Sequence, residues 1–106
     1  FTMLFTGDAE APVEDYLQQK YGSALKADVL KVGHHGSKTS SIYKFISKVQ
    51  PQYALISCGK REIYNHPNKN VVGSLQHLGS KVLTTFDHGN IVVTTDGKGY
   101  EVSTER

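Results

Sequence analysis

Three polar segments of this chain carry side chains that suit metal or phosphate chemistry. Thr6-Gly7-Asp8 ends one apolar run, His34-His35-Gly36-Ser37 follows a second, and Tyr64-Asn65-His66-Pro67 lies in a third polar stretch. Each segment comes after a strand-like stretch. Loops at the carboxyl ends of neighbouring strands meet at one edge of a sheet, where layered α/β proteins usually build their sites. The pattern therefore predicts that the Asp8 carboxylate and the imidazoles gather along such an edge.

Asp8 admits two interpretations. A carboxylate at a strand end can bridge two divalent cations, because each of its oxygens can serve one ion. An aspartate is also a favoured N-cap for a helix, and a helix is expected to begin near Ala11. Local sequence alone favours the cap.

His34 and His35 are candidate metal ligands, because neutral imidazoles are the commonest protein ligands for zinc-like ions. Glycines on both sides, Gly33 and Gly36, let the backbone turn tightly. Adjacent side chains on extended backbone point to opposite sides. We therefore expect one imidazole to be a ligand and the other to contact the substrate or to support the site. The alternative is a polar loop whose histidines cap the next helix.

The other candidates have weaker signals. Ser37 and Lys38 begin a hydroxyl-rich stretch that leads into a helix N-terminus, which suits phosphate but is more typical of ordinary capping. His66 is held extended by Pro67, and an exposed loop histidine is the alternative. Cys58, at the end of an apolar run, is interpreted as a buried and inert thiol.

The apolar runs alternate with amphipathic stretches, which predicts an α/β fold built of βαβ units. We expect strands over 1–7, 28–32 and 52–57, and helices over 10–21, from Ser40 or Ser41 to Val49, and over 69–78. The helix over 10–21 is predicted to bury one face, formed by Ala11, Val13, Tyr16, Leu17 and Tyr21. Residues 81–85 and 90–95 are predicted to form an antiparallel pair around a turn that contains His88, followed by a short strand near 100–102.

Composition sets broad limits. The chain has 106 residues, 38% hydrophobic and 21% charged, with a formal net charge of +2, which describes an ordinary globular protein. No apolar stretch approaches the roughly 20 residues that a membrane span needs, and no signal peptide is evident. The lysines lie mostly between the proposed site loops, which fits an anionic substrate and equally a solvated surface. The chain begins as if in mid-strand, which suggests a fragment of a longer protein.

Taken together, these motifs resemble a known family. The segments TGDAE at 6–10, KVGHHGS at 31–37 and the His66-Pro67 pair, in this order and spacing, are similar to the C-terminal half of a metallo-β-lactamase-fold domain. The match is closest to the ComEC branch of competence proteins, which take up DNA across the bacterial membrane. The resemblance extends over nearly the whole chain.

The resemblance implies half of an αββα sandwich, with a mixed β-sheet and helices packed on one face. Residues 1–106 would be a single domain whose N-terminal half is absent. It also implies a pair of divalent ions, zinc or manganese, in the parent domain. Asp8, His34 and His35 fall on metal-ligand positions, and His35 and His66 on catalytic positions. Substrate contacts fall on four residues: Ser37, Lys38, Asn65 and His66. The expected reaction is phosphodiester hydrolysis, with DNA as the expected substrate.

One departure from the family limits these expectations. The family's first ligand cluster, a His-x-His-x-Asp-His run, does not occur here. We therefore expect the chain alone to bind metal incompletely and to be inactive or nearly so, with the missing half of the domain as its partner. The family more often has glycine where Asn65 stands, so substrate contacts there are the weakest part of the comparison. The alternative functions are a non-catalytic nucleic-acid-binding module and a purely structural one.

A half sandwich should leave one face of its sheet uncovered, and exposed apolar surface favours self-association. We therefore predict a homodimer, joined near residues 1–5 or through the final hairpin. The chain itself is expected to be a soluble domain, and the resemblance implies a parent protein in a bacterial membrane.

Overall fold

The computed structural model describes residues 1–7, 9–33, 41–57 and 69–105. The chain forms, in order, β1 (Met3–Phe5), α1 (Ala11–Tyr21), a 3-10 helix η1 (Gly22–Leu25), β2 (Val29–Lys31), α2 (Tyr43–Val49), β3 (Tyr53–Ile56), α4 (Lys69–His77), β4 (Lys81–Thr84), α5 (Thr85–His88), β5 (Ile91–Thr95) and β6 (Tyr100–Thr104). Among the described helices, none combines the length and the apolar character that a membrane span requires.

Within the described residues, the central layer is a four-stranded sheet in the order β1-β2-β3-β4. Its neighbouring strands are parallel, and their registers are aligned: Phe5 lies opposite Lys31, and Lys31 lies opposite Leu55. The carboxyl ends of the strands therefore lie along one edge of the sheet. Strands β5 and β6 form a separate antiparallel hairpin.

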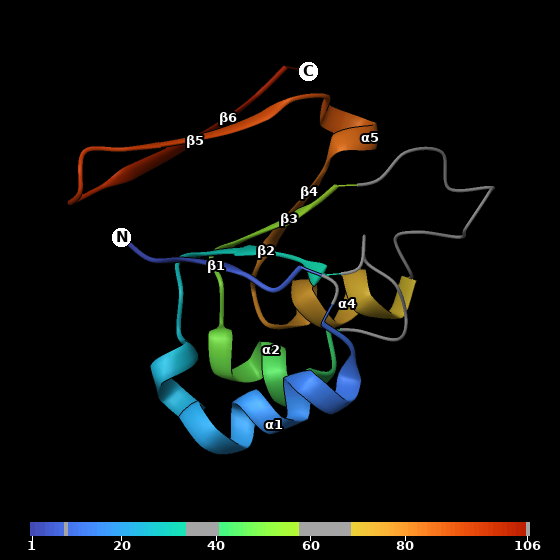
Figure 1. Ribbon diagram of the computed structural model, residues 1–106. Helices are drawn as coiled ribbons and strands as arrows, with labels where there is room; N and C mark the ends of the chain where they lie inside the picture. The colour runs from blue at the N-terminus through green and yellow to red at the C-terminus, as the bar shows by residue number, and fades with distance from the viewer. Residues whose placement is uncertain (8, 34–40, 58–68, 106) are drawn as a thin grey trace.

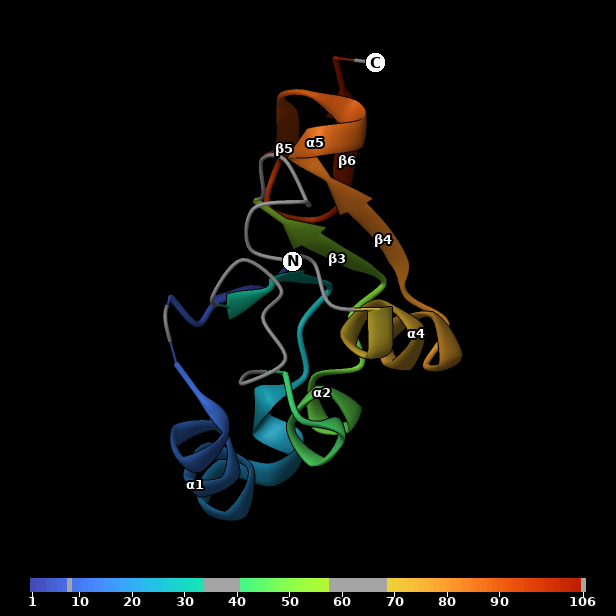
Figure 2. The same cartoon turned by 90° about the vertical axis from the view of Figure 1, so that its right-hand side faces the viewer.

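The sheet lies between two layers of different kinds (Figures 1 and 2). Helices α1, α2 and α4 lie on one side, and the β5–β6 hairpin extends across the other. On the helix side, Leu30, Ala54 and Ile56 pack with buried residues of α2 and α4. On the hairpin side, Val29 and Leu55 pack with residues of β5 and β6. Strands covered on both faces read as continuous apolar runs rather than alternating ones, which explains the sequence of β2 and β3.

Most of the predicted elements are confirmed, but the prediction of a mixed sheet is wrong for the described residues. Strand β4 pairs in parallel with β3, and β5 pairs with β6 rather than with β4. The physical reason lies at Thr84, whose hydroxyl accepts a hydrogen bond from the backbone N–H of Asp87 at 3.1 Å and caps α5. His88 is consequently the last residue of a short helix instead of a hairpin-turn residue. The hairpin also covers the sheet face that was expected to be bare.

The predicted buried face of α1 is wrong in its main members. Val13, Tyr16 and Tyr21 are each about half exposed, whereas Glu14 is only 1% exposed. Residues at spacings of three and four share a helix face, and the face that α1 turns inward carries Glu14 between Ala11 and Leu17, which are partly buried. A carboxylate therefore occupies the centre of a face expected to be apolar.

Candidate functional site at the carboxyl edge of the sheet

The candidate site lies at the edge of the sheet where β1, β2 and β3 end. In the sequence, Asp8 follows β1, and the segment 34–40 follows β2. The segment 58–68 follows β3. Every predicted site residue lies outside the described residues: Asp8, His34, His35, Ser37, Lys38, Asn65 and His66. The described residues that lead into and out of these segments show which elements the segments connect.

The residues that flank Asp8 pack against the residue that precedes His34. A Cβ atom on Gly33 would lie 2.7 Å from the Thr6 hydroxyl oxygen and 3.1 Å from the carbonyl oxygen of Gly7. It would also lie 3.6 Å from the carbonyl oxygen of Ala9. Only glycine permits such an approach without displacing its neighbours. The chain leaving β2 is therefore in contact with residues on both sides of Asp8.

Further hydrogen bonds stabilise this junction. The Thr6 hydroxyl donates to the carbonyl oxygen of Lys31 at 3.3 Å. The backbone N–H of Ala9 donates to the carbonyl oxygen of Thr6 at 3.0 Å, and Gly7 between them has φ of 58°. The N-cap residue of α1 is Glu10, without a side-chain capping bond, and not Asp8. The capping interpretation of Asp8, which local sequence favoured, is therefore not supported.

Glu14 binds the backbone that leads into α2. Its two carboxylate oxygens accept hydrogen bonds from the backbone N–H groups of Ser41 at 2.7 Å and Ile42 at 2.9 Å. Ile42 is the N-cap residue of α2 and makes no side-chain capping bond, so Glu14 satisfies amides at this helix start. The prediction that Ser41 caps the helix is wrong; Ser40 lies outside the described residues.

The environment of Glu14 is electrostatically unfavourable for a charge. Burial raises the pKa of its carboxyl above the ordinary glutamate value, although the hydrogen bonds from Ile42 and Ser41 lower it. Removing a carboxylate from water is costly unless hydrogen bonds compensate. Glu14 thus joins α1, which begins at Ala11, to the start of α2.

These contacts involve residues that flank two of the three site segments. The residues on either side of the segment 34–40 contact neighbouring elements: Gly33 lies against Thr6 and Gly7, and the backbone N–H of Ser41 donates to Glu14 of α1. The segment 58–68 follows Ser57 and precedes α4. Among the described residues, no three His, Cys, Asp or Glu side chains are grouped in a way that could hold a metal ion.

The sequence did not lead us to predict the buried role of Glu14 or the packing role of Gly33. The signal for Glu14 was its position three residues after Ala11 and three before Leu17, on the inward helix face. Gly33 was expected to permit a tight turn, and the structure shows that it also permits close packing against Thr6 and Gly7.

The parallel sheet and the helices on one of its faces define an α/β domain, a class whose members usually carry their sites at the carboxyl ends of the strands. No family model and no solved structure matches the chain. Three curated relatives are similar to it in sequence. ComE operon protein 3 of Bacillus subtilis is 44% identical over 88 residues, which is 83% of this chain and 11% of that protein. Competence protein ComA of Neisseria gonorrhoeae is 42% identical over 83 residues, which is 78% of this chain and 12% of that protein.

The third relative is the uncharacterized protein YcaI of Escherichia coli, 32% identical over 105 residues, which is 99% of this chain and 14% of that protein. The chain thus spans only between 11% and 14% of the length of these relatives.

Proposed function

We propose that this chain is part of a metal-dependent phosphodiesterase or nuclease that acts in DNA uptake. The name of the Neisseria relative refers to competence, and the motifs around Asp8, His34 and His66 resemble those of a hydrolase family. The single observation that carries the proposal is the packing of Gly33 against Thr6, Gly7 and Ala9. It supports an arrangement in which Asp8 and His34 emerge side by side.

The donor set fits a divalent metal ion. A carboxylate and neutral imidazoles are ligands that zinc accepts, and manganese also takes carboxylate and imidazole donors. Asp8, His34 and His35 would hold the metal. When bound, such an ion lowers the pKa of water and neutralises phosphate oxygens. Ser37, Lys38, Asn65 and His66 would bind the substrate, with His35 and His66 near the reacting phosphate.

The chain alone provides too few ligands for two ions. One carboxylate and two or three imidazoles can complete at most one shell, so the other ligands must come from residues outside this chain. The partner in this proposal is the N-terminal half of the same domain. The 106-residue chain should therefore bind metal weakly and hydrolyse DNA slowly or not at all.

Metal titration of the chain tests the proposal. We expect zinc or manganese to bind the wild type, measured by calorimetry, and Asp8→Asn to weaken the affinity at least about tenfold, roughly 1.4 kcal/mol. Asp15→Asn is the matched control, because Asp15 lies on α1 and its carboxylate accepts hydrogen bonds from Gln18 and Gln19. Its affinity for metal should be unchanged.

Two outcomes would contradict the proposal. Equal metal affinity of the Asp8→Asn and Asp15→Asn variants would remove Asp8 from the site. Failure of the wild type to bind metal, together with DNA binding that falls steeply with salt concentration, would favour the non-catalytic nucleic-acid-binding module.

A further inference from the structure

A cavity lies between the sheet and the β5–β6 hairpin, on the side opposite the helices. Its volume is about 370 Å³. Met3, Leu55, Ile91 and Val93 form apolar walls, while Lys31 and Ser57 contribute polar groups. Lys31 is the last residue of β2, and Ser57 directly follows β3. The cavity therefore adjoins the same carboxyl edge from which the candidate site segments leave the sheet.

Lys31 brings a positive charge to this mostly apolar surface. Its side chain is partly buried, and its Nζ atom donates a long hydrogen bond of 3.5 Å to the carbonyl oxygen of Val32. In the described part of the chain, no carboxylate forms an ion pair with Lys31. A partly desolvated ammonium group beside apolar walls favours binding of an anion.

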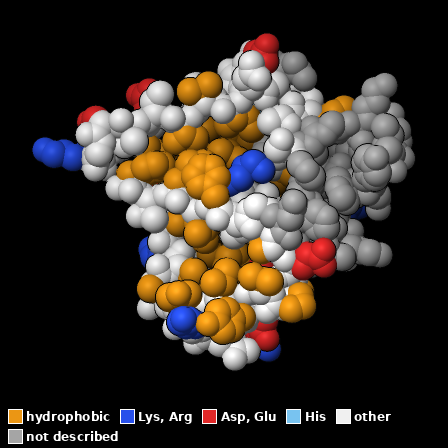
Figure 3. All heavy atoms as spheres, in the orientation of Figure 1, with side chains coloured by type: hydrophobic (Ala, Val, Ile, Leu, Met, Phe, Trp, Pro, Cys, Tyr) orange, Lys and Arg blue, Asp and Glu red, His pale blue; other side chains and the backbone are white. Residues whose placement is uncertain are grey.

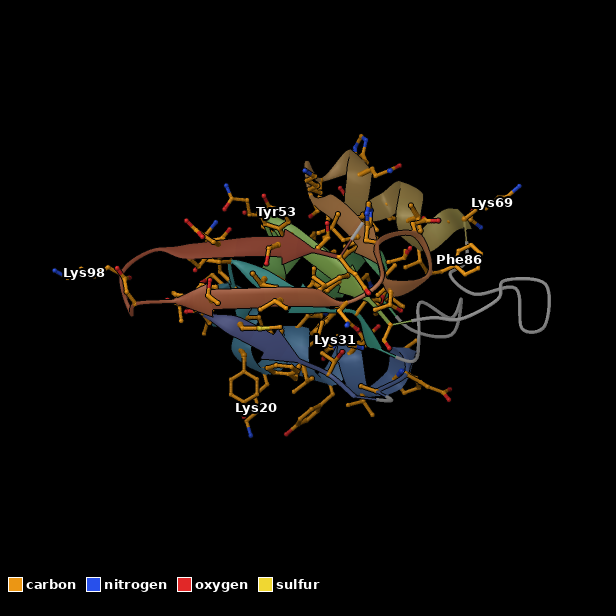
Figure 4. The ribbon with its side chains drawn as sticks, turned by 90° about the horizontal axis from the view of Figure 1, so that it is seen from above. Lys20, Lys31, Tyr53, Lys69, Phe86 and Lys98 are labelled. Carbon is orange, nitrogen blue, oxygen red and sulfur yellow. The ribbon has the colours of Figure 1, made fainter. Side chains whose placement is uncertain are left out.

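The figures show how this charge and the apolar surface are arranged. In Figure 4, Lys31 lies near the middle of the molecule, alongside the hairpin, whereas Lys98 lies at the far tip of the hairpin. Figure 3 shows hydrophobic side chains gathered between the hairpin and the sheet, with a basic side chain at the border of that patch. An apolar surface with one cation beside it is a binding surface for a molecule that is anionic at one end.

We propose that this cavity binds one nucleotide, with its phosphate against the Lys31 ammonium group and its sugar and base against the apolar walls. The inference rests on the proposed function, since a phosphodiester substrate supplies this combination of charge and bulk. The volume lies within the range of pockets that take small ligands, roughly 300–1,000 Å³. The lining residues include no aromatic ring, so the base would pack without stacking and its identity would matter little.

The experiment measures binding of thymidine monophosphate to the 106-residue chain in the presence of a chelator, by NMR titration. We expect shifts of the Leu55, Ile91 and Val93 methyl signals. Lys31→Met should weaken the affinity at least about tenfold, because methionine keeps the apolar stem and removes the charge. Lys98→Met, at the exposed hairpin tip, is the matched control and should leave the affinity unchanged.

Two further probes separate the parts of the proposed ligand. Thymidine, which lacks phosphate, and inorganic phosphate, which lacks the nucleoside, should each bind more weakly than thymidine monophosphate. Val93→Phe should fill the cavity and weaken nucleotide binding. A second cavity-filling variant, Ile91→Phe, provides the same test should Val93→Phe not fold. Their circular dichroism spectra should match the wild type.

The proposal is overturned if Lys31→Met binds the nucleotide as the wild type does, or if inorganic phosphate binds as tightly as the nucleotide. Because the chelator excludes metal, failure of this test leaves the metal-dependent proposal standing. Conversely, loss of the Asp8 metal effect leaves nucleotide binding in this cavity intact.

Discussion

Glu14 shows how a single buried carboxyl group can hold the backbone that leads into α2. Its carboxylate satisfies two amides at the start of α2, and Ser41 beside it has a φ of 60°. That backbone conformation is unfavourable for a residue other than glycine. The hydrogen bonds of Glu14 therefore stabilise a conformation that the local sequence does not favour.

Glu14→Gln should destabilise the fold by about 1–3 kcal/mol. Glutamine offers one acceptor oxygen, and its amide nitrogen would face the second backbone N–H, leaving a buried donor unsatisfied. Urea unfolding followed by circular dichroism measures the change. A loss no greater than that of Asp15→Asn, on the same helix, would contradict this role.

The same variant should alter the pH dependence of stability. Burial raises the pKa of Glu14, so the folded chain binds that proton more tightly than the unfolded chain does. The contribution of Glu14 to the free energy of unfolding consequently decreases as pH rises from the ordinary glutamate pKa through the raised one. Glu14→Gln should lack this decrease. Asp15, whose pKa is lowered by hydrogen bonds from Gln18 and Gln19, should contribute the opposite slope.

At the residue scale, the sequence reveals side chains whose types suit metal or phosphate binding. It does not reveal residues whose role depends on the contacts they make in the folded chain. Asp8 and His34 stand out because their types suit a metal, and their role stays a prediction. Glu14 was missed because glutamate is normally a solvent-facing residue of an amphipathic helix. Only the contact with Ser41, 27 residues away in the chain, makes its burial favourable.

At the scale of elements, the junction between β1 and β2 depends on the absence of a side chain at Gly33. Gly33→Ala would place a methyl group 2.7 Å from the Thr6 hydroxyl oxygen and 3.1 Å from a backbone oxygen. Overpacking of this kind costs about 1–3 kcal/mol. The displaced Thr6 would also lose its hydrogen bond to Lys31.

Gly73→Ala is the matched control for this substitution. Gly73 lies within α4, and a Cβ atom there would meet no other atom within 4 Å. Alanine favours the helix over glycine by up to about 1 kcal/mol, so this variant should be as stable as the wild type or more so. Thermal unfolding of both variants decides the matter. A Gly33→Ala variant as stable as Gly73→Ala would disprove the close packing.

The elements also show that sequence patterns predict the positions of buried strands better than they predict how strands pair. Strands β2 and β3 were predicted well because both faces are covered, so their apolar runs are uninterrupted. The pairing of β4 could not be predicted, because residues 81–85 suit a parallel or an antiparallel neighbour equally. The outcome depends on the cap at Thr84, which ends the strand and begins α5.

At the scale of the whole molecule, the hairpin covers the face expected to be bare, and apolar surface remains elsewhere. Strand β1 is at one end of the strand order in the described sheet, and Phe5 on it is 68% exposed. Beside it, a groove of about 480 Å³ extends toward α1, with Leu4, Val13 and Leu17 among its lining residues. Hydrophobic side chains also gather over the α1 region in Figure 3.

An exposed edge strand beside an apolar groove favours pairing with another chain, so the predicted homodimer should form through β1. Phe5→Lys should convert the dimer to a monomer, because a charge on an edge strand opposes strand pairing and burial. Val92→Lys is the control, since Val92 is 50% exposed but lies on the hairpin, the other surface proposed for association.

Light scattering after size exclusion, over a range of concentrations, measures the oligomeric state of the wild type and of both variants. A monomeric wild type would contradict the dimer. Dissociation by Val92→Lys but not by Phe5→Lys would place the interface at the hairpin. The reason is that each lysine weakens association only through the surface that carries it.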